Sequence, residues 1–271
     1  MMKAFFGSAV MSVLLAGTFG AFVSSAHAVT VSSGDLIRGT TFSAVYYMGA
    51  DGFRYVFPNE KTYKTWYSDA SGNADFSDVV MISDAELADI QMGGNVTYRP
   101  GVKMIKIDTD PKVYVVTEGG TLYHVDSESV ASSLYGSTWN TQIDDVPDGY
   151  FGNYDFSGLA ISTLSGWTAS GETSDITTIN EDKGLMTPEE ISITDNGYDP
   201  IDVTVCVGQK VKFTIDGDDT HTATADDLTW GSGTLQSGET FIRKFTTEGT
   251  DTFYDGYDST NTGAIYIENC D

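Results

Sequence analysis

The chain has 271 residues, enough for one large domain or two ordinary ones, and we expect two; with 40% hydrophobic and 12% aromatic residues it can bury a core. Its 39 Asp and Glu residues outnumber its 14 Lys and Arg residues and give a formal net charge of -25, spread along the chain. Such a surface repels phosphate backbones and anionic lipid head groups, so the sequence argues against a nucleic-acid partner. An excess of acidic residues can also attract divalent cations, but it more commonly indicates a solvated acidic surface.

The first 28 residues have the pattern of an export signal. Lys3 precedes an apolar stretch over residues 4–23, and Ala26 and Ala28 are the small residues that a signal peptidase inspects. We expect a signal peptide over residues 1–28 and a mature protein that begins at Val29. An uncleaved membrane anchor is the alternative. The pattern predicts a periplasmic, cell-surface or extracellular protein with no transmembrane segment after the signal.

An internal repeat organises residues 34–156. Apolar and glycine positions recur 68 residues apart, and a second stretch recurs after a four-residue offset. The first set pairs Val45, Tyr46, Gly52, Tyr55, Phe57, Trp66 and Tyr67 with Val113, Tyr114, Gly120, Tyr123, Val125, Leu134 and Tyr135; the second pairs Ile82, Asp84 and Leu87 with Val146, Asp148 and Phe151. These positions predict an α+β domain of two hairpin-and-helix repeats.

Local signals place the elements of each repeat. Alternating apolar residues around a glycine turn predict a β-hairpin in "VYYMGADGFRYVF" and in "VYVVTEGGTLYHV". Asn59 and Ser127 stand at predicted helix N-caps, and Ser83 with Glu86 forms the pattern of a capping box. Between the repeats, "GGNVTYRPGVKMIKI" predicts a further hairpin that turns at Pro100 and Gly101.

The segments "DGFRYVFPNEKTYKTWY" and "GGNVTYRPGVKMIKI" resemble a repeat module of exported bacterial surface proteins. The resemblance rests on aromatic and glycine positions, which describe packing and turns, and implies no activity. After this domain, residues 157–187 are rich in Ser, Thr, Gly and acidic residues, which predicts a linker. Trp167 is its one large aromatic residue, and we expect it to dock on a neighbouring domain.

Residues 188–271 alternate short strand patterns with turns, which predicts a β-sandwich. The spacing of its residues resembles the cupredoxin family of plastocyanin and azurin over the whole module. The resemblance is carried by Tyr198, Pro200, Val203, Val205, Gly208, Val211, Phe213, Asp218, His221, Gly233, Leu235, Gly238, Phe241, Phe245, Gly249, Thr252, Tyr254, Gly263 and Ile265. It implies a Greek-key sandwich and, in the family, one-electron transfer through a copper ion.

Three of the four copper ligands that the resemblance implies are replaced. His221 stands at the position of the first histidine ligand, whereas Asp255, Asp258 and Asn261 stand where the family has Cys, His and Met. Without a thiolate the blue-copper bond cannot form. We therefore expect no cofactor; the alternative is a non-blue copper or electron-transfer site that uses His221 with oxygen ligands.

Cys206 and Cys270 are the two cysteines of the chain. An isolated pair in an exported protein is more often a disulfide than a redox or metal site, so we expect them to pair with each other.

Other constellations are weaker. Residues 69–78 carry oxygen ligands at alternate positions, but Ala74 and Val80 stand where a calcium loop needs glycine and glutamate. His124 and His221 are the only histidines after the signal, and they lie in different domains, so no catalytic triad is evident. We expect a surface or interaction protein rather than an enzyme, with a cell-envelope or extracellular protein or glycan as its partner. A polysaccharide-cleaving enzyme, with two carboxylates near Trp66 or Trp139, is a further alternative.

Overall fold

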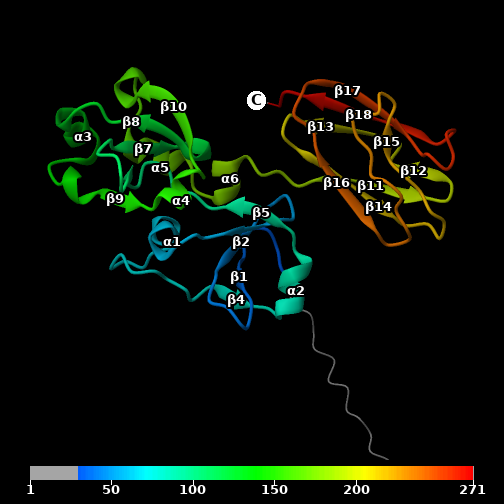
Figure 1. The fold of residues 1–271 in the computed structure, drawn as a ribbon, viewed down its shortest axis with the longest axis horizontal. Coiled ribbons are helices and arrows are strands. Elements are labelled where there is room, and N and C mark those ends of the chain that lie inside the picture. Colours follow the sequence, from blue (N-terminus) through cyan, green and yellow to red (C-terminus); the bar gives the residue numbers. More distant parts are fainter. Residues whose placement is uncertain (1–29, 271) are drawn as a thin grey trace, which may run out of the picture.

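The computed structural model describes residues 30–270, so the predicted signal peptide and its cleavage site lie outside the described residues. Figure 1 shows three parts in chain order: a small sheet with helices, a second such sheet, and a β-sandwich. The protein is mainly β. Among the helices of residues 30–270, none combines the length and the apolar character needed to cross a bilayer.

The first part is a five-stranded sheet in the order β4-β1-β2-β3-β5. Its three central strands pair antiparallel, and the two outer strands pair parallel to their neighbours. Its elements are β1 (Leu36–Arg38), β2 (Tyr46–Met48), β3 (Arg54–Val56), α1 (Glu60–Trp66), β4 (Val79–Met81), α2 (Asp84–Asp89) and β5 (Met92–Asn95).

The second part is also a five-stranded sheet, in the order β10-β8-β7-β6-β9, again antiparallel in the centre and parallel at both edges. Taken in chain order, its strands have the same neighbours and the same pairing sense as those of the first sheet. Its elements are β6 (Met104–Ile107), β7 (Tyr114–Thr117), η1 (Glu118–Gly120), β8 (Thr121–His124), α3 (Glu128–Tyr135), η2 (Trp139–Thr141), β9 (Ile143–Val146), α4 (Asp148–Phe151) and β10 (Asp155–Ala160).

The local signals of both units are confirmed. The two predicted hairpins are β2 with β3 and β7 with β8. Asn59 accepts a hydrogen bond from the Thr62 backbone N–H, and Ser127 accepts one from Val130, so both cap the helices expected after them. Ser83 and Glu86 form the predicted capping box at the start of α2. These contacts satisfy N–H groups that a helix leaves unpaired in its first turn.

The hairpin predicted at Pro100 and Gly101 is wrong. Strands β5 and β6, which flank this turn, belong to different sheets. The chain crosses from one unit to the next here, because Tyr98 is 1% exposed and packs in the core of the second unit. Gly101 then has a φ of +74°, and a Cβ at this position would lie 2.1 Å from the Ala169 carbonyl oxygen, so only glycine fits the turn.

Residues 157–187, predicted as a linker, are folded and packed against both units. They carry the end of β10, η3 (Ile161–Thr163), α5 (Ala169–Asp175) and α6 (Ile179–Lys183). Ile161 packs in a core cluster of the second unit and Ile179 in that of the first, which a flexible linker would not do. The Ser- and Thr-rich composition misled the prediction, since these residues serve here as helix caps at Thr168 and Thr178. Trp167 docks beside the second core, as expected, and its indole N–H donates to Glu172.

Helix α6 lies between the two units and fastens them through a buried carboxylate (Figure 1). Asp182 is 2% exposed and accepts hydrogen bonds from the Thr97 hydroxyl of the first unit and the Gly119 backbone N–H of the second. Removal from water raises the pKa of Asp182 to about 6, although the neighbouring Lys183 charge and these donors act in the opposite direction.

The third part is a sandwich of two four-stranded sheets, in the orders β12-β11-β14-β16 and β13-β18-β17-β15. Alternate residues of its strands face inward, for example Val211, Phe213 and Ile215 of β14, and build one core around Phe213 and Trp230. Its strands are β11 (Glu189–Thr194), β12 (Gly197–Asp199), β13 (Asp202–Cys206), β14 (Lys210–Ile215), β15 (Thr224–Ala225), β16 (Thr240–Lys244), β17 (Gly249–Tyr254) and β18 (Thr262–Glu268).

The sandwich contacts the first unit through an ion pair. Asp51, which is 3% exposed, accepts hydrogen bonds from the Tyr55 hydroxyl at 2.7 Å and from the Lys210 ammonium. The same ammonium lies 3.5 Å from the centre of the Phe53 ring. The buried carboxylate thus has two hydrogen-bond donors, and the Lys210 ammonium contacts both the carboxylate and an aromatic ring.

One residue of the sandwich has a strained backbone. Leu228 has a φ of 60° and a side chain that is 71% exposed. A left-handed conformation costs a non-glycine residue about 1–2 kcal/mol, and little apolar burial offsets that cost here. We expect Leu228→Gly to raise the free energy of unfolding by about 0.5–1 kcal/mol, because glycine relieves the strain but has more freedom to lose on folding. Urea denaturation measures this change. Leu228→Ala keeps the strain and should leave stability unchanged; equal stabilisation by both variants would contradict the interpretation.

Candidate functional site

The backbone around His221 fixes the position of its side chain. His221 and Leu235 exchange two backbone hydrogen bonds, at 3.1 and 2.9 Å, in an isolated bridge that follows the loop after β14. The imidazole is directed into the end of the sandwich, and the residue is 6% exposed. The structure thus buries the one residue that the sequence resemblance gave as a retained ligand position.

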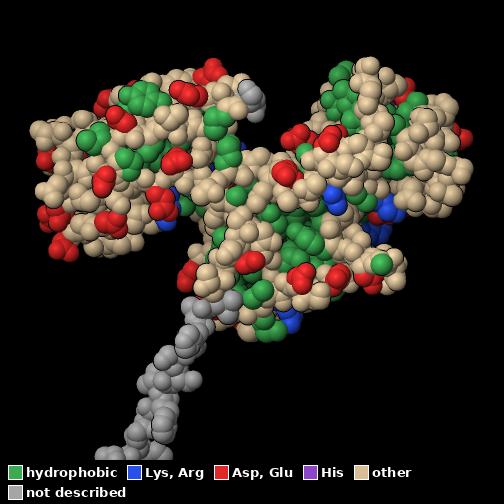
Figure 2. All heavy atoms as spheres, turned by 180° about the vertical axis from the view of Figure 1, so that it is seen from behind, with side chains coloured by type: hydrophobic (Ala, Val, Ile, Leu, Met, Phe, Trp, Pro, Cys, Tyr) green, Lys and Arg blue, Asp and Glu red, His purple; other side chains and the backbone are tan. Residues whose placement is uncertain are grey.

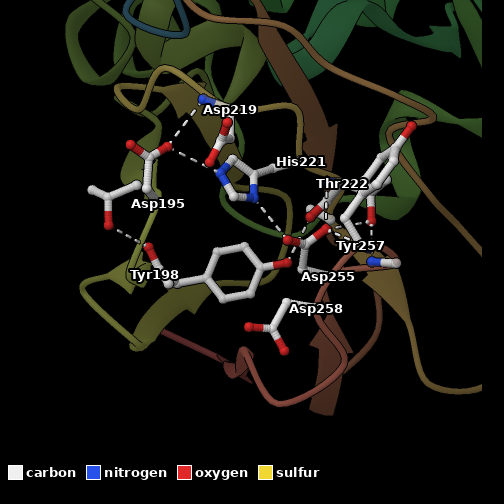
Figure 3. A network of polar contacts seen from close by, with 12 residues as sticks. Asp195, Tyr198, Asp219, His221, Thr222, Asp255, Tyr257 and Asp258 are labelled. Atoms are coloured by element: carbon white, nitrogen blue, oxygen red, sulfur yellow. Dashed lines mark hydrogen bonds and ion pairs between the residues drawn. The ribbon is translucent and has the colours of Figure 1, made fainter.

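The imidazole of His221 lies between two carboxylates (Figure 3). Its Nδ1 atom is 2.8 Å from Oδ2 of Asp255, and its Nε2 atom is 3.5 Å from Oδ1 of Asp195. Both ring nitrogens are thus occupied by interactions with protein oxygens. Because carboxylates only accept hydrogen bonds, this arrangement favours an imidazolium that donates from both nitrogens.

Asp255 is held rigidly on the far side of the imidazole. It is 1% exposed, and its second oxygen accepts hydrogen bonds from the backbone N–H groups of Thr222 and Tyr257, at 2.9 and 3.1 Å. The Thr222 hydroxyl adds a further contact to the same oxygen. Tyr198 closes the site from below, since its hydroxyl donates to the Thr222 carbonyl at 2.6 Å. A buried carboxylate with this many donors is fully paired.

Asp195 is the member of the site that the sequence did not reveal. It lies in the turn after β11, where it accepts hydrogen bonds from the backbone N–H groups of Asp218 and Asp219. Strand β11 pairs parallel with β14, so the turns after these two strands meet at the same edge of the sheet. A correct prediction of the parallel pairing between β11 and β14 would have placed Asp195 near His221.

The charge state of the site follows from these contacts. Burial by itself lowers the pKa of His221, but the hydrogen bonds and negative charges of Asp255 and Asp195 outweigh it and raise the pKa above the ordinary value of 6.5. The pKa of Asp195 is lowered, first by the N–H groups of Asp219 and Asp218 and then by His221. Both directions favour the charged forms of His221 and Asp195.

The other two predicted positions, Asp258 and Asn261, make no hydrogen bond to His221 among residues 30–270. Hydrogen bonds from Thr260 lower the pKa of Asp258, and the charge of His221 contributes in the same direction. The Asp258 carboxylate accepts hydrogen bonds from the backbone and hydroxyl of Thr260, at 3.0 and 2.7 Å, and no interaction in Figure 3 links it to the imidazole. Asn261 closes the loop through its backbone, since its carbonyl accepts from the Asp255 N–H and its N–H donates to the Asp258 carbonyl. These residues shape the loop that presents Asp255.

This set of side chains does not fit a blue-copper centre. The site offers one imidazole and no sulfur, whereas such a centre needs a thiolate and two imidazoles. Cys206 and Cys270 cannot supply the thiolate, because they form the predicted disulfide, with Cα atoms 5.4 Å apart. Within residues 30–270, no group of three or more His, Cys, Asp or Glu side chains is arranged to hold a metal ion.

The remaining candidates are separate from this site. In the loop over residues 69–78, Asp69 accepts hydrogen bonds from the backbone N–H groups of Ser71 and Asn73, and Asp75 accepts one from Ser77, so these carboxylates stabilise turns of their own loop. His124 lies on β8 of the second unit, where its ring makes an edge contact with Tyr114. Acidic side chains are spread over the face of the molecule seen in Figure 2 rather than gathered in one patch.

Comparison with known proteins gives similar folds only. No family model and no curated protein matches the sequence. Among solved structures, a purple cupredoxin from Nitrosopumilus maritimus is 21% identical, with a TM-score of 0.28, over 30% of this chain and 99% of the other. A copper-containing nitrite reductase from Thermus scotoductus is 20% identical, with a TM-score of 0.28 over 30% of this chain, and the match spans 22% of the reductase. A reduced amicyanin mutant is 17% identical, with a TM-score of 0.28, over 30% of this chain and 82% of the other. The copper chemistry in these names belongs to those proteins.

Proposed function

We propose that this protein is exported and acts as a surface or interaction protein whose C-terminal module is a degenerate, copper-free cupredoxin-like sandwich. The observation that carries the proposal is the 2.8 Å contact between Nδ1 of His221 and Asp255. Asp255 stands where the family has its cysteine ligand. Its carboxylate pairs with the His221 nitrogen that would otherwise bind the metal. In this proposal the contact between His221 and Asp255 stabilises the end of the sandwich and takes no part in electron transfer.

The N-terminal domain supports an interaction role. Residues 34–156 are proposed to be two copies of one unit, because the two sheets share their strand order and the sequences match at an offset of 68 residues. Duplicated modules on an exported chain offer repeated surfaces to a partner, for which we propose a cell-envelope or extracellular protein or glycan. Export is supported by the Cys206–Cys270 disulfide and by the signal-like residues 1–28.

A copper titration of the purified full-length mature protein tests the proposal. We expect isothermal calorimetry and paramagnetic resonance to show no stoichiometric Cu(II) binding that depends on His221. The matched control is His221→Gln, which removes the imidazole and should give the same weak background as the wild type. One equivalent of Cu(II) that is lost in His221→Gln would overturn the proposal in favour of a non-blue copper site with oxygen ligands.

A further inference from the structure

The second unit contains a pocket of about 230 Å³ that the proposed function does not use. It lies where β7, β8 and β10 run side by side. Leu122, which is 1% exposed, belongs both to the core and to the lining of the pocket. Tyr114, Phe156 and Leu159 supply apolar surface around it. The pocket thus has the size and apolar lining to hold one small ring.

A bulge in β10 builds one side of this pocket. The pairing with β8 shifts in register between Phe156 and Ala160, and Gly158 adopts a φ of +74° within the shift. The Ser157 hydroxyl fastens the bulge by donating to the Leu122 carbonyl at 2.8 Å. As a result, Phe156 and Leu159 are 58% and 53% exposed beside the pocket instead of packing into the core.

The aromatic side chains of the pocket support one another. Tyr114 and His124 face each other across β7 and β8, with ring centres 5.8 Å apart. The Phe156 ring stands nearly perpendicular to that of Tyr114, at 79° and 5.4 Å. These edge contacts limit the movement of the rings, so the aromatic lining exists before a ligand binds.

Two basic side chains in the lining make no hydrogen bond or ion pair through their side chains within residues 30–270. Among the residues that the structure describes, neither the Lys112 ammonium nor a ring nitrogen of His124 has a hydrogen-bond or ion-pair partner. Lys103 and Lys106, on the same sheet or next to it, are paired with Asp144 and Asp145. An unpaired cation and an imidazole thus stand together beside an apolar pocket. They are complementary to an anion.

We propose that this pocket binds a small organic monocarboxylate that carries one apolar ring. The ring would contact Phe156 and Leu159 above Leu122, and the carboxylate would accept hydrogen bonds from Lys112 and His124. A single negative charge suits the site, because the acidic surface of the whole chain repels polyanions. The inference goes beyond the proposed function, since it concerns the second unit and not the sandwich.

Phenylacetate is the probe, and saturation-transfer NMR on the full mature protein follows the carbon-bound protons of each ligand. We expect saturable binding of phenylacetate, and binding about tenfold weaker for acetate, which lacks the ring, and for phenylacetamide, which lacks the charge. Lys112→Gln and Phe156→Ala should each weaken phenylacetate binding by about tenfold. Lys112 is exposed, so Lys112→Gln should keep the wild-type melting temperature.

Lys106→Gln is the matched control, because Lys106 lies on the same sheet but is paired with Asp145 and does not line the pocket. It should bind phenylacetate as the wild type does. The proposal is overturned if phenylacetate shows no saturable binding, if phenylacetamide binds equally well, or if Lys106→Gln weakens binding as much as Lys112→Gln.

Discussion

Replacing Asp255 by alanine is expected to lower the free energy of unfolding of the sandwich by about 3–5 kcal/mol, because it leaves the buried His221 ring and two backbone N–H groups without their partner. Hydrogen exchange of the amides of β14 and β18 reports this module separately from the rest of the chain. Asp258→Ala is the matched control from the same loop. Its carboxylate is exposed and hydrogen-bonded to Thr260, and it interacts with His221 through charge alone, so we expect a much smaller loss than for Asp255→Ala. Equal losses in the two variants would show that the ion pair is not the source of stability.

The same pair should make stability depend on pH. The pKa of His221 is raised in the folded state, so its stabilising contribution is complete below about pH 6.5 and is lost as the pH rises through the higher folded value. Asp255→Asn keeps the shape of the side chain but removes its charge. We expect the stability difference between wild type and Asp255→Asn, measured by urea denaturation, to shrink as the pH rises above 6.5. Other titrating groups, such as Asp182, are common to both proteins and cancel in this difference. A difference that grows with pH would contradict the assignment.

Removing the disulfide is the second change with a large expected effect. Cys206 ends β13, and Cys270 follows β18, the strand that pairs with β13, so the bond ties the C-terminus to the edge of the sheet. The two residues are 64 positions apart, and on the chain-entropy account a loop of this length corresponds to about 4 kcal/mol. The double variant with Cys206→Ser and Cys270→Ser should lose this amount, because it frees the unfolded chain.

Hydrogen exchange again separates the modules. Protection of β14 and β18 should fall in the double cysteine variant, whereas protection of β2 and β7 in the N-terminal units should not change. Wild-type protein treated with a reductant is the chemical counterpart and should behave like the variant. Unchanged protection of β18 in both samples would show that the strand pairing alone holds the C-terminus.

The candidate site was only half predictable. The resemblance singled out His221 and Asp255 as expected positions of copper ligands, but it did not predict that the two side chains contact each other. Their direct contact depends on the path of the loop over residues 255–261, which backbone hydrogen bonds of Asn261 close. Asp195 was missed, because its partners are the N–H groups of Asp218 and Asp219 on another turn. A hydrogen-bond partner more than twenty residues away cannot be recognised from a local sequence pattern.

What the sequence determined by itself are the features whose partners lie within a few residues or whose chemistry is unique. The hairpin turns, the Asn59 and Ser127 caps and the capping box at Ser83 are of the first kind, because the same few residues supply both donor and acceptor. The disulfide is of the second kind, since the chain offers only one pair of cysteines. The alternating strands of the sandwich also follow directly from the period of the side chains.

What only the tertiary structure decided are the features whose partners come from another sheet. Tyr98 leaves the first unit to enter the core of the second, and Ile179 turns a Ser- and Thr-rich segment into part of the first core. The pocket beside Phe156 needs a bulge in β10 as well as the pairing of β10 with β8. Burial of an apolar side chain lowers the free energy wherever the folded chain provides an apolar surface to cover it. That surface exists only once the sheets have assembled.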